Sequence, residues 1–135
     1  MPAPYTGGCQ CGAVRYVLTA EPARLAACHC KECQRQSGSA FSMSLVVKPD
    51  ALTVTGPTKQ FTRIADSGNA VAGVFCPDCG VRIYHAPKPS QGVIALKPGT
   101  LDDTSWLRPS HFIWMKRAQR WVPVPDGIQA LEGQS

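Results

Sequence analysis

The sequence lacks the features that mark membrane and secreted proteins. No apolar run in it approaches the roughly 18 residues of a membrane-spanning helix, so a membrane protein is not expected. Residues 1–5 have neither a basic start nor an apolar stretch, so no secretion signal is expected. Together these absences predict a cytoplasmic chain, kept in a reducing compartment where cysteine thiols persist and can hold metal.

Charged residues are also few. They make up 17% of the 135 residues, whereas hydrophobic residues make up 44%, a balance typical of a folded domain and not of a disordered chain. We expect one domain over residues 1–135, with its core at about 5–125 and a loose tail over 130–135.

Helical periodicity is scarce, because 12 glycines and 12 prolines divide the chain into short pieces. Seven short stretches have the apolar alternation of strands: 13–18, 41–47, 52–55, 59–64, 71–75, 81–84 and 93–97. Strands this short and this closely spaced predict a mainly β, antiparallel fold. Two short helices are expected, over 31–36 and 101–106.

The seven cysteines are confined to three clusters. Their odd number, the reducing compartment and the Cys-x-Cys spacing disfavour disulfides. Seven thiolates also cannot supply two four-cysteine iron–sulfur clusters. A structural zinc takes four thiolates, and a catalytic zinc takes three protein ligands and keeps one position open. The cysteine count therefore predicts two zinc ions per chain, one in each kind of site.

The third cluster has the spacing of a zinc knuckle. Cys76 and Cys79 are followed by Gly80, which tolerates the positive φ that such a turn needs. Cys9 and Cys11 can complete the site, because residues i and i+2 of an extended segment face the same side. These four thiolates predict a structural zinc.

The central cluster differs because Cys28, Cys30 and Cys33 lie within six consecutive residues. Three thiolates can occupy one face of a tetrahedron and leave the fourth corner to water or substrate, which predicts a catalytic zinc. A histidine could instead close this site and make it structural. The candidates are His29, His85 and His111, of which His29 is expected to point away from the metal.

The formal charge of +5 raises the question of nucleic acid. Zinc sites with four and three thiolates carry −2 and −1, which lowers the charge of the loaded protein to about +2. The lysines and arginines are scattered along the sequence. An ordinary solvated surface is the favoured interpretation, and nucleic acid is not expected as a partner.

Three segments, 7–16, 28–41 and 75–80, resemble the motifs of the glutathione-dependent formaldehyde-activating enzyme family, also called GFA-domain or centromere-protein-V-like proteins. The resemblance implies a zinc-stapled β-fold similar to that of the Rab-accessory zinc proteins and the methionine-R-sulfoxide reductases. It also implies a structural zinc on one set of cysteines and a catalytic zinc on the other: Cys9, Cys11, Cys76 and Cys79, against Cys28, Cys30 and Cys33.

The family implies a carbon–sulfur lyase that condenses formaldehyde with glutathione to S-hydroxymethylglutathione, so a small thiol such as glutathione is the expected partner. Candidate donors to the aldehyde are His29, Lys31, Arg35 and Ser37. Two alternatives remain. One is a non-catalytic, zinc-stabilised module that binds protein or nucleic acid. The other is a methionine sulfoxide reductase-like enzyme, which needs a free nucleophilic cysteine, whereas all seven here are assigned to metal.

Overall fold

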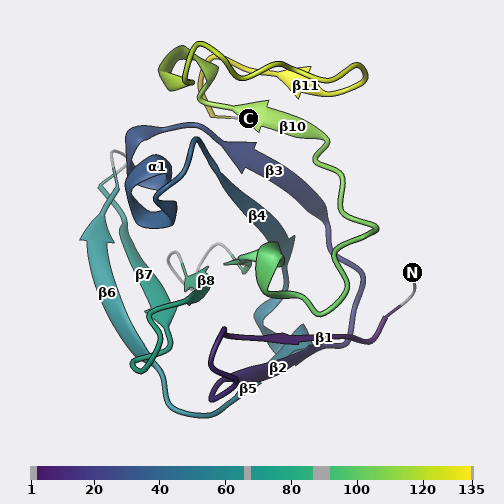
Figure 1. Cartoon of the computed structure of the whole chain (residues 1–135), viewed down its shortest axis with the longest axis vertical. Coiled ribbons are helices and arrows are strands. Elements are labelled where there is room, and N and C mark those ends of the chain that lie inside the picture. The colour runs from purple at the N-terminus through teal and green to yellow at the C-terminus, as the bar shows by residue number, and fades with distance from the viewer. Residues whose placement is uncertain (1–2, 66–67, 87–91, 135) are drawn as a thin grey trace.

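The computed structural model describes residues 3–65, 68–86 and 92–134. Within these ranges the strands form two sheets, one of three strands and one of eight. Figure 1 shows them around a common interior, with β6 and β7 on one side, β3 and β4 on the other, and the smaller sheet below. Most strand pairs are antiparallel, so the prediction of a mainly β, antiparallel fold is confirmed.

The smaller sheet has the order β1-β2-β5, with β1 at Tyr5–Gly8, β2 at Arg15–Leu18 and β5 at Leu52–Thr55. Side chains of β2 alternate between exposed and buried, as expected for a strand with one face against the core. Its inward residues, Tyr16 and Leu18, are almost completely enclosed. This sheet therefore covers one side of the hydrophobic interior.

The larger sheet has the order β11-β10-β3-β4-β9-β8-β7-β6. Its strand β10 is the exception to the antiparallel pattern, since it runs parallel to both β3 and β11. The strand bounds are Arg24–Cys28 for β3, Ser42–Val47 for β4, Lys59–Ile64 for β6, Ala70–Phe75 for β7, Arg82–Ala86 for β8, Ile94–Leu96 for β9, His111–Ile113 for β10 and Gln129–Ala130 for β11.

Two groups of buried side chains form the core. The larger joins both sheets and includes the fully buried Leu18, Leu45, Ile83 and Leu96 together with Cys9 and Cys76. The smaller lies beneath the helix α1 (Lys31–Ser37) and consists of Ala26, Cys28, Cys33 and Ile113. Each cysteine cluster is thus anchored in a packed region and not in a free loop.

All seven predicted strands are present, with ends shifted by a residue or two. Four further strands were not predicted from the sequence: β1, β3, β10 and β11. Short 3₁₀ turns join several strands, namely η1 (Pro49–Ala51), η3 (Pro98–Thr100) and η4 (Met115–Arg117).

The helix predicted over 31–36 is confirmed as α1, but the one predicted over 101–106 is wrong. Leu101 forms an isolated bridge with Gly7, and the Asp102 N–H donates to the Thr6 carbonyl at 2.9 Å. The Asp103 carboxylate accepts hydrogen bonds from the Ser105 N–H and hydroxyl, which builds a turn. Pairing with β1 has overridden the local helical preference.

The loose tail predicted over 130–135 is wrong for the part that the structure describes. Ala130 pairs with Phe112 in β10, and the Leu131 N–H donates to the Phe112 carbonyl at 2.8 Å. The Trp114 N–H donates to the Gly133 carbonyl at 3.0 Å. Residue 135 lies outside the described ranges.

Candidate metal centres and the surrounding site

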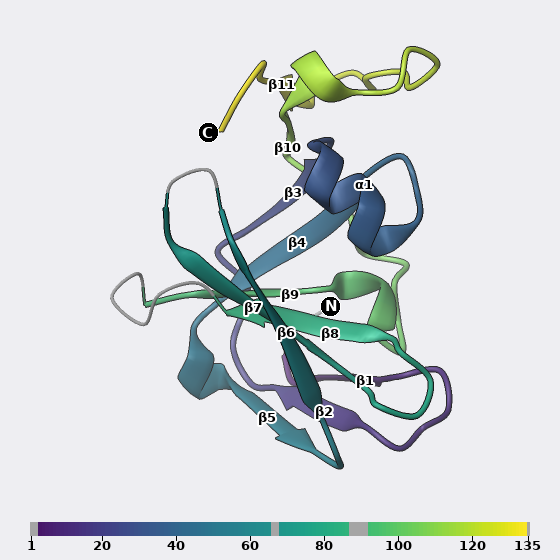
Figure 2. The same ribbon diagram turned by 90° about the vertical axis from the view of Figure 1, so that its left-hand side faces the viewer.

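Four cysteines from two distant turns meet at one point. Cys9 and Cys11 follow β1, and Cys76 and Cys79 lie between β7 and β8. Figures 1 and 2 show these two connections side by side. All four sulfurs lie within 4.8 Å of one another. The structure therefore brings together the four cysteines that the sequence analysis grouped.

Backbone hydrogen bonds shape both turns. The Cys9 N–H donates to the Val14 carbonyl at 3.0 Å, and the Cys76 N–H donates to the Val81 carbonyl at 3.0 Å. The knuckle closes with a bond of 2.8 Å from the Gly80 N–H to the Cys76 carbonyl, and Gly80 has the expected positive φ of 80°. The turns hold the sulfurs close together through the backbone.

The spacing of the sulfurs fits a tetrahedral metal ion. With metal–sulfur bonds of about 2.3 Å, the edge of a zinc tetrahedron is about 3.8 Å. The sulfurs of Cys9 and Cys11 are 3.6 Å apart, and those of Cys11 and Cys76 are 3.7 Å apart. Four soft thiols at this separation could hold a zinc ion.

Hydrogen bonds also prepare part of this group for ionisation. The N–H of Val81, followed by that of Cys11, lowers the pKa of Cys79 to about 6. Burial raises the pKa of Cys9, but bonds from the Val14 N–H and the Cys11 thiol outweigh burial and leave that pKa lowered. Thiolate is the form that binds metal, so the turns favour metal uptake.

The second group is built where β3 passes into α1. Cys28 ends β3, which lies between β4 and β10. Cys30 is the N-cap of α1, and its sulfur accepts a hydrogen bond of 3.4 Å from the Cys33 N–H. The three sulfurs lie within 4.8 Å of one another, with Cys28 and Cys33 only 8% and 9% exposed.

One thiolate of this group is stabilised by the other two thiols. Hydrogen bonds from Cys28 and then Cys33 lower the pKa of Cys30 to about 2. A second negative charge is disfavoured: the Cys30 contact raises the pKa of Cys28. The Cys28 thiol lowers the pKa of Cys33, but the Cys30 contact and burial together outweigh it and raise that pKa to about 11. Three close thiols of this kind suit a metal cation, which would neutralise the charge of all three.

Histidine does not complete the second group. Among residues 3–65, 68–86 and 92–134, no histidine, aspartate or glutamate brings a ligand atom within the same 4.8 Å of its three sulfurs. His29 is fully buried between the rings of Phe41 and Phe112, with centroids 4.9 and 5.0 Å away. His85 accepts from Arg82, and His111 contacts the Ser110 hydroxyl at 2.7 Å.

A buried lysine that the sequence analysis missed lies beside the three-cysteine group. Lys97 is 9% exposed, and its Nζ donates to Ser42 Oγ and Ser44 Oγ, each at 3.1 Å. Ser42 is the β4 residue directly opposite Cys28 in the ladder. Burial lowers the pKa of Lys97, and the negative charge of Cys33 and Cys28 opposes that shift. Its only sequence signal is its place at the end of an apolar strand.

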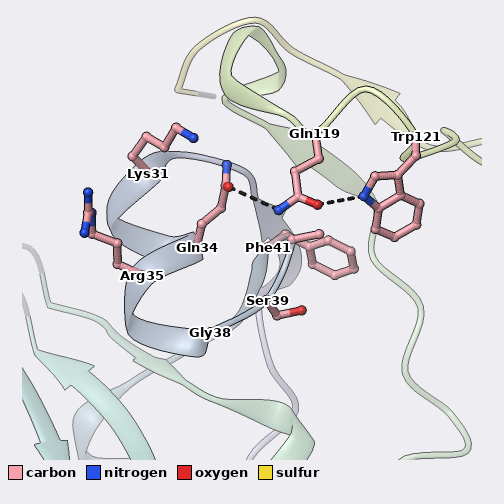
Figure 3. Close-up of a pocket in the computed structure, with 9 residues that line it drawn as sticks. Lys31, Gln34, Arg35, Gly38, Ser39, Phe41, Gln119 and Trp121 are labelled. Atoms are coloured by element: carbon pink, nitrogen blue, oxygen red, sulfur yellow. Dashed lines mark hydrogen bonds between the residues drawn. The ribbon is translucent and has the colours of Figure 1, made fainter.

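The proposed donors on α1 have other contacts. The Ser37 hydroxyl donates to the Cys33 carbonyl at 2.7 Å and so belongs to the end of the helix. Lys31 and Arg35 are exposed and border an open cavity of about 550 Å³ (Figure 3). There Gln34, Gln119 and Trp121 form a hydrogen-bonded row, and the two basic side chains extend from α1 away from Trp121.

No helix in the described part of the chain has both the length and the apolar character that crossing a bilayer requires.

The fold and the two cysteine groups define a small, mainly β protein with two places that could hold metal ions. Residues 4–117 match the sequence model of the family described as glutathione-dependent formaldehyde-activating enzyme, and the chain belongs to this family.

Two fungal relatives carry the same family name. The protein of Phaeosphaeria nodorum is 30% identical over 91% of this chain and 66% of its own length. The protein of Penicillium rubens is 29% identical over 78% of this chain and 59% of its own length. The chain thus spans about two thirds or less of these relatives.

A crystal structure of a Rhodobacter sphaeroides protein has a similar fold. Its TM-score is 0.57, at 18% sequence identity, and the match covers 75% of this chain and 91% of the other. At this identity the likeness supports the fold alone.

Proposed function

We propose that the protein is a zinc-dependent carbon–sulfur lyase that joins a small thiol to formaldehyde, or splits the resulting adduct. Glutathione is the candidate thiol, because the family and its relatives are named for glutathione and formaldehyde. The observation that carries the proposal is the three-cysteine group, for which the described residues offer no fourth histidine or carboxylate ligand. Three ligands and a free corner are the arrangement of catalytic zinc sites.

The two cysteine groups have different roles in this proposal. Cys9, Cys11, Cys76 and Cys79 would hold a structural zinc that joins two turns far apart in the sequence. Cys28, Cys30 and Cys33 would hold a second zinc within one short segment. When bound there, zinc would lower the pKa of a thiol and polarise a carbonyl oxygen. The seven free thiols also suit a reducing compartment such as the cytoplasm.

In the condensation, the thiol loses its proton and its sulfur forms a bond to the carbonyl carbon. The carbonyl π electrons move to oxygen, which takes up a proton and gives the S-hydroxymethyl product. The reverse reaction breaks the same carbon–sulfur bond. Both directions develop negative charge on sulfur or oxygen, so a fixed positive charge nearby favours them.

Lys97 supplies that charge. Its ammonium group donates hydrogen bonds to Ser42 and Ser44. The negative charge of the three cysteines favours its charged form. Because the lysine already donates to Ser42 Oγ, the Ser42 hydroxyl keeps its own proton available for an acceptor. Lys97 and Ser42 also line a cavity of about 390 Å³, so substrate could approach them. We therefore assign Lys97 as the positioning cation of the site.

The activity can be tested with ¹³C-formaldehyde and glutathione by NMR exchange spectroscopy. The zinc-loaded protein should accelerate exchange between formaldehyde and S-hydroxymethylglutathione above the uncatalysed rate, and Cys30→Ser should abolish the acceleration. An acceleration that persists in Cys30→Ser would show that the reaction does not take place at the three-cysteine group. No acceleration by the wild type, with both metals bound, would favour a non-catalytic zinc module.

A further inference from the structure

A cavity of about 260 Å³ gathers positive charge from three separate elements. Its lining includes Arg35 from α1, Arg63 from β6 and Arg82 from β8, with Glu32 and His85 beside them. These arginines are far apart in the sequence, where the basic residues look scattered. The fold brings these three arginines together in one local cluster.

The charge of this cluster is not balanced by the protein. Glu32 is the one acidic residue in the lining, and its carboxylate is 3.9 Å from Arg63 Nε. Among the described residues Arg35 and Arg82 form no ion pair. Burial and then repulsion from Arg63 lower the pKa of Arg82. Three guanidinium groups against one carboxylate favour the binding of an anion.

Arg82 is held in place for such a contact. Its Nη1 donates to His85 Nε2 at 2.9 Å, since a guanidinium has no acceptor. Burial, followed by the charges of Lys97 and Arg82, lowers the pKa of His85 to about 3, so the ring is neutral and adds no charge to the cavity. The arginine is therefore oriented by a partner that does not neutralise it.

Gly73 provides the space that the guanidinium occupies. A Cβ at this position would lie 2.4 Å from Arg82 Nη1 and 2.9 Å from Arg82 Cζ. Gly73 pairs with His85 across β7 and β8, so glycine, histidine and arginine form one local unit. Any side chain at residue 73 would displace the guanidinium.

This cavity adjoins the proposed reaction site. Glu32 and Arg35 belong to the helix that contains Cys33. Gln36 and Arg82 line both this cavity and the one that contains Lys97 and Ser42. A ligand anchored on the arginines could extend along this shared wall toward the three-cysteine group.

We propose that Arg35, Arg63 and Arg82 form the site that binds a carboxylate of the thiol substrate. This inference rests on the proposed function and narrows it: the substrate is an acidic thiol, such as a cysteine-containing peptide with free carboxylates. Guanidinium groups bind carboxylates through paired, charge-assisted hydrogen bonds, whereas a neutral thiol would gain nothing from them. In this proposal the arginines bind the carboxylate of the substrate, and the reaction takes place at the three-cysteine group.

The test uses a probe that cannot react. The tripeptide γ-glutamyl-2-aminobutyryl-glycine has a methyl group where glutathione has its thiol, so it has no sulfur to place on a metal. Calorimetric titration of the zinc-loaded protein should show binding that weakens with added salt. Arg82→Gln and Arg63→Gln should each weaken it by about tenfold or more.

Lys48→Gln is the matched control, because it removes one positive charge from an exposed residue that lines none of the three cavities. It should change the affinity by less than about twofold. Zinc content and circular dichroism verify that each variant is folded, and Arg63→Gln remains informative if Arg82→Gln does not fold. A probe whose two carboxylates are amidated should not bind.

The proposal is overturned if the wild type does not bind the probe, or if folded arginine variants bind it as tightly as Lys48→Gln. Either result would leave the lyase activity untouched. Conversely, binding that depends on the arginines would support the site even if the exchange assay showed no acceleration. In an active enzyme, Arg82→Gln should raise KM for glutathione, whereas Lys48→Gln should leave it unchanged.

Discussion

Lys97 Nζ lies 3.1 Å from Ser42 Oγ, and this hydrogen bond joins a buried cation to the β4 residue that pairs with Cys28. Burial removes water from the charged lysine, and this costs free energy of folding unless neighbouring groups compensate for it. The two serine hydroxyls and the charge of the three-cysteine group provide that compensation.

Replacement of Lys97 should affect thiol binding more than folding. In Lys97→Met we expect the four-cysteine group to keep its metal, while the three-cysteine group binds added thiol about tenfold more weakly, because the compensating charge is gone. Metal analysis and thiol titration measure the two effects. Lys59→Met, at an exposed position on β6, is the control and should bind thiol as the wild type does. Unchanged thiol affinity in folded Lys97→Met would refute the role given to this lysine.

Loss of a ligand from the four-cysteine group should prevent folding. Cys79→Ser removes one of four thiolates that connect the β1–β2 turn to the β7–β8 turn. Structural zinc contributes on the order of 10 kcal/mol, which exceeds the net stability of many small domains. The variant should be insoluble or unfolded by circular dichroism. A soluble variant that melts at the wild-type temperature would contradict a structural role for this group.

Loss of a ligand from the three-cysteine group should be milder. Cys28, Cys30 and Cys33 belong to one short segment, and backbone pairing with β4 and β10 holds β3 in the sheet. Cys30→Ser should remain folded and retain about one zinc per chain, against about two in the wild type. Mass spectrometry under native conditions measures this ratio. If Cys30→Ser unfolds as Cys79→Ser does, both groups are structural.

The sequence was informative where function depends on local spacing. Cys76, Cys79 and Gly80 lie within five residues, and their turn could be predicted from residue type alone. The division of the cysteines into groups of four and three could be predicted in the same way, and the structure groups them identically. That these groups bind zinc remains a prediction.

Features that depend on distant contacts could not be predicted. The parallel pairing of β10 with β3 joins residues 111–113 to 26–28, and no local pattern marks it. Segment 101–106 has the residues of a short helix, but its backbone is engaged by Gly7 and Thr6. The arginine cluster is also invisible in the sequence, because α1, β6 and β8 meet only in the folded chain.

His85 should make the fold sensitive to acid. The unfolded chain protonates this histidine near pH 6.5, whereas the folded protein does so only near pH 3, because burial and nearby positive charges lower its pKa. Its contribution to stability is therefore complete above pH 6.5 and is lost as the pH falls from there toward 3, by at most about 1.4 kcal/mol per pH unit.

The matched comparison for this effect is His85→Gln, whose amide oxygen can still accept a hydrogen bond from Arg82. Urea denaturation between pH 5 and 7 should show a shallower pH dependence in the variant than in the wild type. Cysteine protonation adds the same slope to both proteins, so the difference isolates the histidine. Equal slopes would show that His85 is not buried in its neutral form.

The central claim is that the three-cysteine group keeps an exchangeable position, and cobalt substitution tests it most directly. Cobalt bound by Cys28, Cys30 and Cys33 should show thiolate charge-transfer absorption, and its d–d bands should change when glutathione, cysteine or 2-mercaptoethanol is added. The titration should release protons, since an incoming thiol must ionise to bind. Cobalt bound by Cys9, Cys11, Cys76 and Cys79, observed alone in Cys30→Ser, should not respond. A wild-type spectrum that no thiol changes would mean that the fourth position is closed, and the catalytic assignment would be wrong.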